Sequence, residues 1–264
     1  MTDTKVTGME YEARLFFYNR LRQARANALR DAEGYHDIIV VLEQLGLFQS
    51  QGAGTPGSGL DSYTESLKKI AEGSILAIEI PSEYPSLHPA FDKLYKSVRL
   101  ARNDAVHEGA YARHLTNHAV QLALILEDAL MTGLTSIADY MVRDPVCAAA
   151  WQPVSFVRQQ MLLNSFSYLP VQLEKDGVVS WYTIADSSVA RYLREASSRT
   201  DRRRRLARTV ANAYAEGLLK LDPAITVAIS AEIADVLAKF DGRPLLILDE
   251  HQRLAGIVTA FDLL

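Results

Sequence analysis

Six consecutive residues near the middle of the chain supply the groups that acid–base cleavage of a phosphodiester requires. They stand where a long amphipathic pattern turns polar, and they read Arg102-Asn103-Asp104-Ala105-Val106-His107. The guanidinium of Arg102 stays charged and offers a planar fork of donors to phosphate oxygens. His107 is of the side-chain type whose ordinary pKa allows proton transfer in either direction near neutrality. Neither role needs a metal.

The elements that must position these residues are expected to be helices throughout the first half. Gly34 separates the first two predicted helices, and the second is expected to end at Gly46 or soon after. A Gly, Ser and Pro cluster over 49–59 predicts a loop, and the prolines over 81–89 predict a connector without secondary structure. Apolar residues recur at helical spacing over 10–32, 35–48, 61–71, the run that resumes at 90, and 115–130.

This helical half, expected over 1–132, resembles the HEPN domains, whose metal-independent ribonuclease members carry Arg, Asn, three further residues and His. The match is Arg102, Asn103 and His107. The resemblance implies cleavage of RNA to 2',3'-cyclic phosphate and 5'-hydroxyl ends, as in toxin or defence-like nucleases. His107 would act as general base or acid, Arg102 would stabilise charge on the phosphoryl oxygens, and Asn103 would orient the imidazole or hold a phosphate oxygen. HEPN toxins place a tyrosine two residues after the histidine, where this chain has Gly109.

Spacing sets a condition on this chemistry. Residues five apart on a straight α-helix differ by about 140° around the axis and by roughly 7.5 Å along it, so Arg102 and His107 would not face one phosphate directly. A bend in the helix would bring the two side chains together. A two-fold homodimer would instead bring both motifs to one groove, as the resemblance suggests. The alternative is structural, because cations in the last turn before Gly109 also stabilise a helix through its dipole.

The second half, residues 133–264, follows a different pattern, in which short β-rich runs alternate with single helices. The same order occurs twice, in copies of about sixty residues that must pack on each other to bury their sheets. We expect copy one over about 134–195, an arginine-rich connector over 196–215, and copy two over about 216–264.

This repeat resembles a tandem pair of CBS domains, a module associated with adenine nucleotides in the cleft between its copies. The best match is the segment 254–262, in which a glycine, an apolar pair and Thr259 are followed three residues later by Asp262. The hydroxyl can donate to phosphate, and the carboxylate can accept from both ribose hydroxyls. The sequence stops two residues after Asp262, so we expect copy two to be completed by another segment or to fray there.

Copy one repeats the hydroxyl and the acid as Thr183 and Asp186. Ser180 and Trp181 replace the glycine that precedes them, so Trp181 is expected either to fill part of the groove or to stack on a base. The resemblance implies AMP, ADP, ATP or a related adenine nucleotide as a regulatory ligand. The alternative is that the two acids cap helices and that the pair serves as a dimerising scaffold.

Arginines concentrate in the connector between the copies. Four are consecutive and would cover every side of a helix, so no single packing face explains them. We interpret the run as a solvated surface or as a docking strip for RNA phosphates or a polyphosphate ligand. Its members are Arg199, Arg202, Arg203, Arg204, Arg205 and Arg208.

Composition bounds the class of protein. The net charge of −4 argues against non-specific coating of nucleic acid, so RNA contact would need a local basic surface or symmetry. The sequence contains no apolar run of about 18 residues, so no membrane span is predicted. Its first residues lack the pattern of a secretory leader, and the single Cys147 cannot form an internal disulfide. We therefore expect a cytoplasmic protein. His114 and His118 lie four apart, but no third ligand is spaced to complete a site, so no metal is expected.

These observations predict an α plus α/β chain, in which an all-α HEPN-like bundle precedes a tandem CBS pair with small mixed sheets flanked by helices. The first hypothesis is a homodimeric endoribonuclease that an adenine nucleotide regulates. The alternative is a non-catalytic nucleotide sensor whose helical half mediates dimerisation or partner binding.

Overall fold

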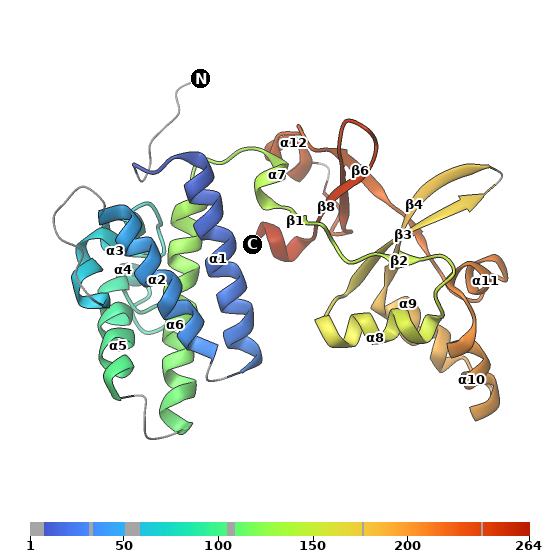
Figure 1. Cartoon of the computed structure of the whole chain (residues 1–264), viewed down its shortest axis with the longest axis horizontal. Helices are drawn as coiled ribbons and strands as arrows, with labels where there is room; N and C mark the ends of the chain where they lie inside the picture. The colour runs from blue at the N-terminus through green and yellow to red at the C-terminus, as the bar shows by residue number, and fades with distance from the viewer. Residues whose placement is uncertain (1–7, 32–33, 51–58, 105–108, 176, 239) are drawn as a thin grey trace. The chain divides into compact units, whose positions relative to one another are not determined.

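The computed structural model describes residues 8–31, 34–50, 59–104, 109–175, 177–238 and 240–264. The chain divides into two compact units, Met1–Leu134 and Thr135–Leu264. The described residues of the first unit form helices only, and the second unit combines helices with two sheets (Figure 1). The expected combination of a helical region followed by small mixed sheets with helices is therefore confirmed, whereas the assignment of the bundle to HEPN stays a prediction.

The helical unit is built around its last helix. α1 (Tyr11–Arg30) and α2 (Tyr35–Ser50) both pack on α6 (Gly109–Met131). Shorter elements complete the unit: η2 (Leu60–Tyr63), α3 (Thr64–Ala71), α4 (Glu79–Glu83) and α5 (Phe91–Asp104). Their apolar faces form one continuous core, which includes the fully buried Leu21, Leu42, Leu67, Leu94 and Leu126. The apolar residues that recur at helical spacing in the sequence are therefore the ones that face the core of the bundle.

Two local features of this unit depend on single residues. α2 ends at Ser50, soon after Gly46 as expected, and a Cβ at position 46 would lie 2.4 Å from the Cβ of Tyr63. This glycine therefore lets η2 approach α2 closely. The prediction of an unstructured connector over 81–89 is wrong at its start, where Pro81 belongs to α4. Proline is tolerated there because the first turn of a helix has no internal acceptors for its N–H groups.

Two arginines of α1 are directed into the unit. The Nε and Nη2 atoms of Arg14 donate to the carbonyl oxygen of Leu130 at 2.9 and 2.6 Å, and Nη2 also donates to that of Thr132. These carbonyls end α6, where helical partners are missing. Arg25 forms a two-pronged ion pair with Glu127, with both distances 2.9 Å. Burial raises the pKa of Glu127, although Arg25 opposes the shift. Polar contacts thus fix α1 to α6 in addition to apolar packing.

The second unit contains two sheets of four strands each. In copy one the order is β2 (Ala148–Ala149), β3 (Tyr168–Lys175), β4 (Val178–Ala185) and β5 (Asp222–Pro223). In copy two it is β1 (Val142–Arg143), β8 (Leu254–Val258), β7 (Leu245–Leu248) and β6 (Ile225–Ala228). The β2–β3 and β6–β7 pairs are parallel, and the other pairs are antiparallel. The helices of this unit are α7 (Ile137–Tyr140), α8 (Val154–Asn164), α9 (Asp186–Arg194), α10 (Arg199–Ala207), α11 (Val210–Ala215), α12 (Ile233–Leu237) and η3 (Ala260–Leu263).

The copies exchange strands. β1 lies in the sequence range expected for copy one but pairs with β8 of copy two, and β5 lies in the range expected for copy two but pairs with β4 of copy one (Figure 1). α7 goes with β1, since Ile137 and Met141 share the core of copy two with Ile247 and Val258. The N–H of Ile137 also donates to the carbonyl of Ala231 at 2.9 Å. The segment 135–143 therefore contributes a helix and a strand to copy two.

Candidate functional site

The predicted hydroxyl and acid of copy two lie together at the end of β8. Thr259 follows the strand, and both its N–H and its Oγ1 donate to Oδ2 of Asp262, at 2.7 and 2.8 Å. The pair caps η3 as a capping box. The alternative expectation of a capping role is thus met, while the same geometry holds a hydroxyl next to a carboxylate at a strand end.

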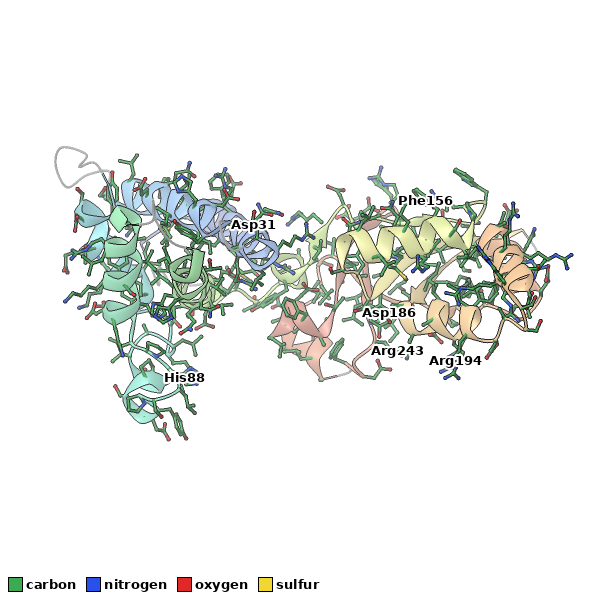
Figure 2. All side chains as sticks on the ribbon, turned by 90° about the horizontal axis from the view of Figure 1, so that it is seen from below. Asp31, His88, Phe156, Asp186, Arg194 and Arg243 are labelled. Carbon is green, nitrogen blue, oxygen red and sulfur yellow. The ribbon has the colours of Figure 1, made fainter. Side chains whose placement is uncertain are left out.

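The equivalent residues of copy one are arranged differently. Thr183 is buried in β4, and its Oγ1 donates to the carbonyl of Asp222 in β5 at 3.5 Å. Asp186 begins α9 with an exposed side chain that accepts from the N–H of Ser187 (Figure 2). The exchanged strand β5 therefore engages the hydroxyl of copy one. The two copies do not present equal Thr and Asp pairs, which the equal spacing in the sequence does not reveal.

A cavity of about 480 Å³ lies between segments of both copies. We call it the Trp181 cavity. Gln172 and Trp181 are cross-strand partners in β3 and β4, and the turn between β7 and β8 contributes Arg253. Its other principal lining residues are Asp144, Cys147 and Leu254. Thr183, Asp186, Thr259 and Asp262 are not among the residues that line it. Of the lining residues, Trp181 was singled out from the sequence as a possible ligand contact, because it replaces a glycine of the CBS pattern.

Charged groups surround one side of this cavity. An adjoining cavity of about 430 Å³ shares Asp144, Arg253 and Leu254 with it and adds Arg143 and Asp249. Arg253 donates to Asp249 through Nε at 2.8 Å, and its Nη2 lies 2.7 Å from the same oxygen. The backbone N–H of Arg253, together with its guanidinium, holds the pKa of Asp249 below its usual value. Asp144 has a φ of 47°, a left-handed conformation that is uncommon outside glycine.

Cys147 also lines the Trp181 cavity. Cys147 is exposed, yet partial burial around its sulfur raises the pKa of the thiol. Because the thiolate is the reactive form, this thiol should react slowly at neutral pH.

The connector arginines divide into two groups. Nη1 of Arg205 donates to the carbonyl of Tyr192 at 2.6 Å, and Nη1 of Arg202 donates to that of Leu193 at 3.2 Å. Arg208 pairs with Glu216 at 2.8 Å. These three side chains therefore hold α9, α10 and α11 together, and a purely solvated surface is a wrong description of them. The exposed members that remain for a docking strip are Arg199, Arg203 and Arg204.

The residues predicted to cleave RNA lie around the junction of α5 and α6. Arg102 and Asn103 belong to the last turn of α5, which is described to Asp104, and α6 is described from Gly109. The side chains of Arg102 and Asn103, and the whole of His107, lie outside the described residues. Their assignment as catalytic residues stays a prediction.

A Ser and His contact joins the same two helices elsewhere. Oγ of Ser97 in α5 lies 2.8 Å from Nδ1 of His118 in α6, and the rings of His114 and His118 meet with centroids 4.1 Å apart. Burial, and then the charges of His114 and Lys93, lower the pKa of His118. Across the described residues, no three His, Cys, Asp or Glu side chains are grouped to hold a metal ion.

A known protein family matches the last part of the second unit. Residues 220–264 match the family described as CBS domain, and this region contains β5 to η3 with Thr259 and Asp262. No curated protein matches the chain. Within the described ranges, none of the helices combines the length and hydropathy that a membrane span requires.

Solved structures resemble about half of the chain. A hemolysin-like protein containing a CBS domain from Oenococcus oeni PSU is 16% identical over 50% of this chain and 89% of its own, with a TM-score of 0.36. CbpB in complex with c-di-AMP is 15% identical over 50% and 84%, with a TM-score of 0.38. The CBS domain of a bacterial CNNM/CorC family Mg²⁺ transporter in complex with ATP is 19% identical over 48% and 83%, with a TM-score of 0.37.

Proposed function

We propose that this chain is a nucleotide-sensing regulatory protein whose second unit binds an adenine nucleotide through copy two. The observation that carries the proposal is the CBS domain match over 220–264, which contains Thr259 and Asp262. The helical unit would then mediate dimerisation or the binding of a partner protein. This function was the alternative at the level of the sequence, and the comparisons favour it over the ribonuclease.

The geometry of copy two supports the proposal. The capping box keeps the hydroxyl of Thr259 and the carboxylate of Asp262 at 2.8 Å, so both are arranged before a ligand arrives. A carboxylate has about four acceptor positions, so its oxygens can accept from ribose hydroxyls as well as from Thr259. Copy one is the weaker candidate, because its Thr183 hydroxyl is buried and donates to Asp222.

Calorimetric titration tests this proposal. The panel is AMP, ADP, ATP and c-di-AMP, the last two because resembling proteins were solved with them. Asp262→Asn keeps an acceptor for the cap but removes the charge, and it should weaken binding by about 10- to 100-fold, as for hydrogen bonds to a charged group. Asp235→Asn, an exposed acid on α12 of the same copy, is the control and should bind as wild type. If no member of the panel binds the wild type at millimolar concentration, the proposal fails.

The ribonuclease remains a second proposal for the helical unit. The feature in its favour is the order of elements, since Arg102 and Asn103 end α5 directly ahead of the last helix of the unit. Incubation of transfer, messenger and ribosomal RNA with EDTA present, using the wild type, Arg102→Ala and His107→Ala, tests it. Cleavage by the wild type alone, with cyclic phosphate ends, supports the enzyme. Intact RNA in all three samples leaves the regulatory protein as the function.

A further inference from the structure

We propose that a cluster of side chains between α5 and α6 binds a dianionic phosphate group. We call it the His118 cluster, and its members are Lys93 and Ser97 of α5 and His114 and His118 of α6. The two helices pack side by side (Figure 1). The cluster belongs to the helical unit, so the inference goes beyond the proposed function, which concerns copy two of the other unit.

Contacts between the two helices hold the cluster together. Oγ of Ser97 lies 2.8 Å from Nδ1 of His118, and the rings of His114 and His118 meet edge to face with centroids 4.1 Å apart. Lys93 stands about one helical turn before Ser97, and its charge lowers the pKa of the His118 ring. Lys93 and His114 are exposed and the other two side chains are half-buried, so an ion can reach the cluster from solvent.

The basic groups of this cluster have no carboxylate beside them among the described side chains of the two helices. The acidic side chains described there have other partners, namely Asp92 with Lys68, Glu127 with Arg25 and Asp128 with Ser74. Besides burial, the groups that lower the pKa of His118 are the basic His114 and Lys93. Gathering three basic side chains in this way costs free energy, and a bound dianion would offset that cost.

The hydroxyl of Ser97 couples ligand binding to the protonation of His118. When the imidazole is neutral, Ser97 can donate to Nδ1, and Nε2 then carries the ring proton. When the ring is protonated, Nδ1 becomes a donor and the Ser97 oxygen accepts, which frees the hydroxyl proton for a ligand. The protonated cluster therefore offers an anion one more positive charge and one more donor than the neutral cluster does.

A phosphate monoester group suits these donors better than a carboxylate does. It carries nearly two negative charges at neutral pH and has three strong acceptor oxygens, so it can meet several donors at once. A carboxylate has one charge and two oxygens. The same dianionic group occurs in free inorganic phosphate and at the phosphorylated end of an RNA strand.

Sulfate is the probe of the predicted pH dependence, because it remains a dianion throughout the neutral range. Calorimetry of the full chain should show that sulfate binds about 3- to 10-fold more weakly at pH 7.5 than at pH 6.5, because binding raises the pKa of His118 and takes up a proton. Sulfate should also shift the ring resonances of His118 to saturation in NMR spectra. Chloride at equal ionic strength should not. The inference is overturned if no ring of the cluster responds.

Competition with sulfate identifies the source of the phosphate group. Inorganic phosphate should displace sulfate. A short 5'-phosphorylated oligoribonucleotide that displaces it at a lower concentration than inorganic phosphate assigns the site to an RNA end, and one that needs a higher concentration assigns it to free phosphate. The same strand with a 5'-hydroxyl is the control. Equal displacement by the two strands would mean that singly charged backbone phosphates occupy the cluster, and would overturn the inference.

Substitutions separate the cluster from charge elsewhere on the protein. Lys93→Ala should weaken sulfate binding about 10-fold, as for the loss of a hydrogen bond to a charged group. Lys69→Ala removes an exposed lysine of α3 and should have little effect. His118→Asn should remove the pH dependence, and Asp262→Asn should leave sulfate binding unchanged. Equal losses in Lys93→Ala and Lys69→Ala would overturn the inference, while nucleotide binding by copy two, and with it the proposed function, would stand.

Discussion

Several arginines that the sequence presents as polar surface hold helices in place. Arg14 donates to carbonyls at the end of α6, and Arg205 donates to Tyr192 and Glu195 at the end of α9. A guanidinium suits this position because it has several donors in one plane and complements the negative end of the helix dipole. An arginine count alone therefore overstates the basic surface available to RNA.

The ion pair between Arg25 and Glu127 gives a first prediction. Their side chains are 12% and 7% exposed, so Glu127→Ala should leave a buried cation unpaired and cost about 3–5 kcal/mol in the free energy of unfolding. Replacing both residues together, as Arg25→Met and Glu127→Leu, should recover most of this loss. Urea denaturation followed by circular dichroism measures both effects. Lys68→Ala, which breaks the exposed pair with Asp92, is the control and should change nothing measurable. Equal losses in the single and double variants would contradict the prediction.

His118 predicts a pH dependence of the helical unit. Burial is the main cause that lowers the pKa of His118 in the folded protein below 6.5, the value of the unfolded chain. Between the folded and the unfolded pKa, the unfolded chain therefore binds more protons. The free energy of unfolding should be highest above about pH 6.5 and should fall as the pH drops below that value. Hydrogen exchange of α6 at pH 7.5 and pH 5.5 measures this, and His118→Asn should reduce the difference. His251→Asn changes an exposed ring of the other unit and should not. An unaltered difference in His118→Asn would assign the effect to other groups.

Among the secondary-structure elements, β8 explains why a glycine belongs to the CBS pattern here. Gly256 faces β1, and a Cβ on it would lie 2.5 Å from Sδ of Met141. The glycine thus admits the segment that completes copy two. Gly256→Ala should destabilise the second unit by about 1–3 kcal/mol through overpacking. In a Met141→Ala background the cost should shrink, and thermal unfolding of the four proteins gives the coupling energy. Additive effects would show that Met141 moves aside without cost.

The helices and strands that could be predicted from the sequence are those in which apolar residues recur at a regular spacing. The helices of the first half, and the strands β7 and β8, follow from apolar spacing and turn residues. The exchange of strands could not be predicted, because β1 and β5 have two residues each and carry no periodicity. For the same reason the Trp181 cavity was missed. Its residues come from three segments that only the exchange brings together, although Trp181 itself stood out. Thr183 and Thr259 each precede an aspartate by three residues, so nothing in the sequence indicated that the hydroxyl of Thr183 donates to β5.

For the molecule as a whole, the exchange of strands predicts that the folding of copy two depends on the first residues of the second unit. A chain that begins at Thr135 should form both sheets, because it includes α7 and β1. A chain that begins at Asp144 lacks Ile137 and Met141 of the copy-two core and should lose cooperative unfolding of that copy. Two-dimensional NMR spectra of the two fragments compare them. Well-dispersed β7 and β8 resonances in the shorter fragment would contradict this role of the segment 135–143.

If the helical unit does cleave RNA, the two units give a further prediction. A ligand changes activity only when it binds two states of the protein unequally. The rate of cleavage should then change on addition of the nucleotide that copy two binds, and Asp262→Asn should abolish the change at the same nucleotide concentration. Gel assays with and without the nucleotide measure it. An unchanged rate at saturating nucleotide would mean that the units act independently.

The swapped strands also impose an order on events while the ribosome makes the chain. Ile137 and Met141 emerge long before β7 and β8 have been translated, so they wait without their apolar partners. Copy one cannot close its sheet until Asp222 has appeared, and copy two cannot close until Val258 has. Each copy therefore closes only after a segment distant in the sequence has been translated. A nascent chain that stalled between these points would present uncovered apolar residues to chaperones and proteases.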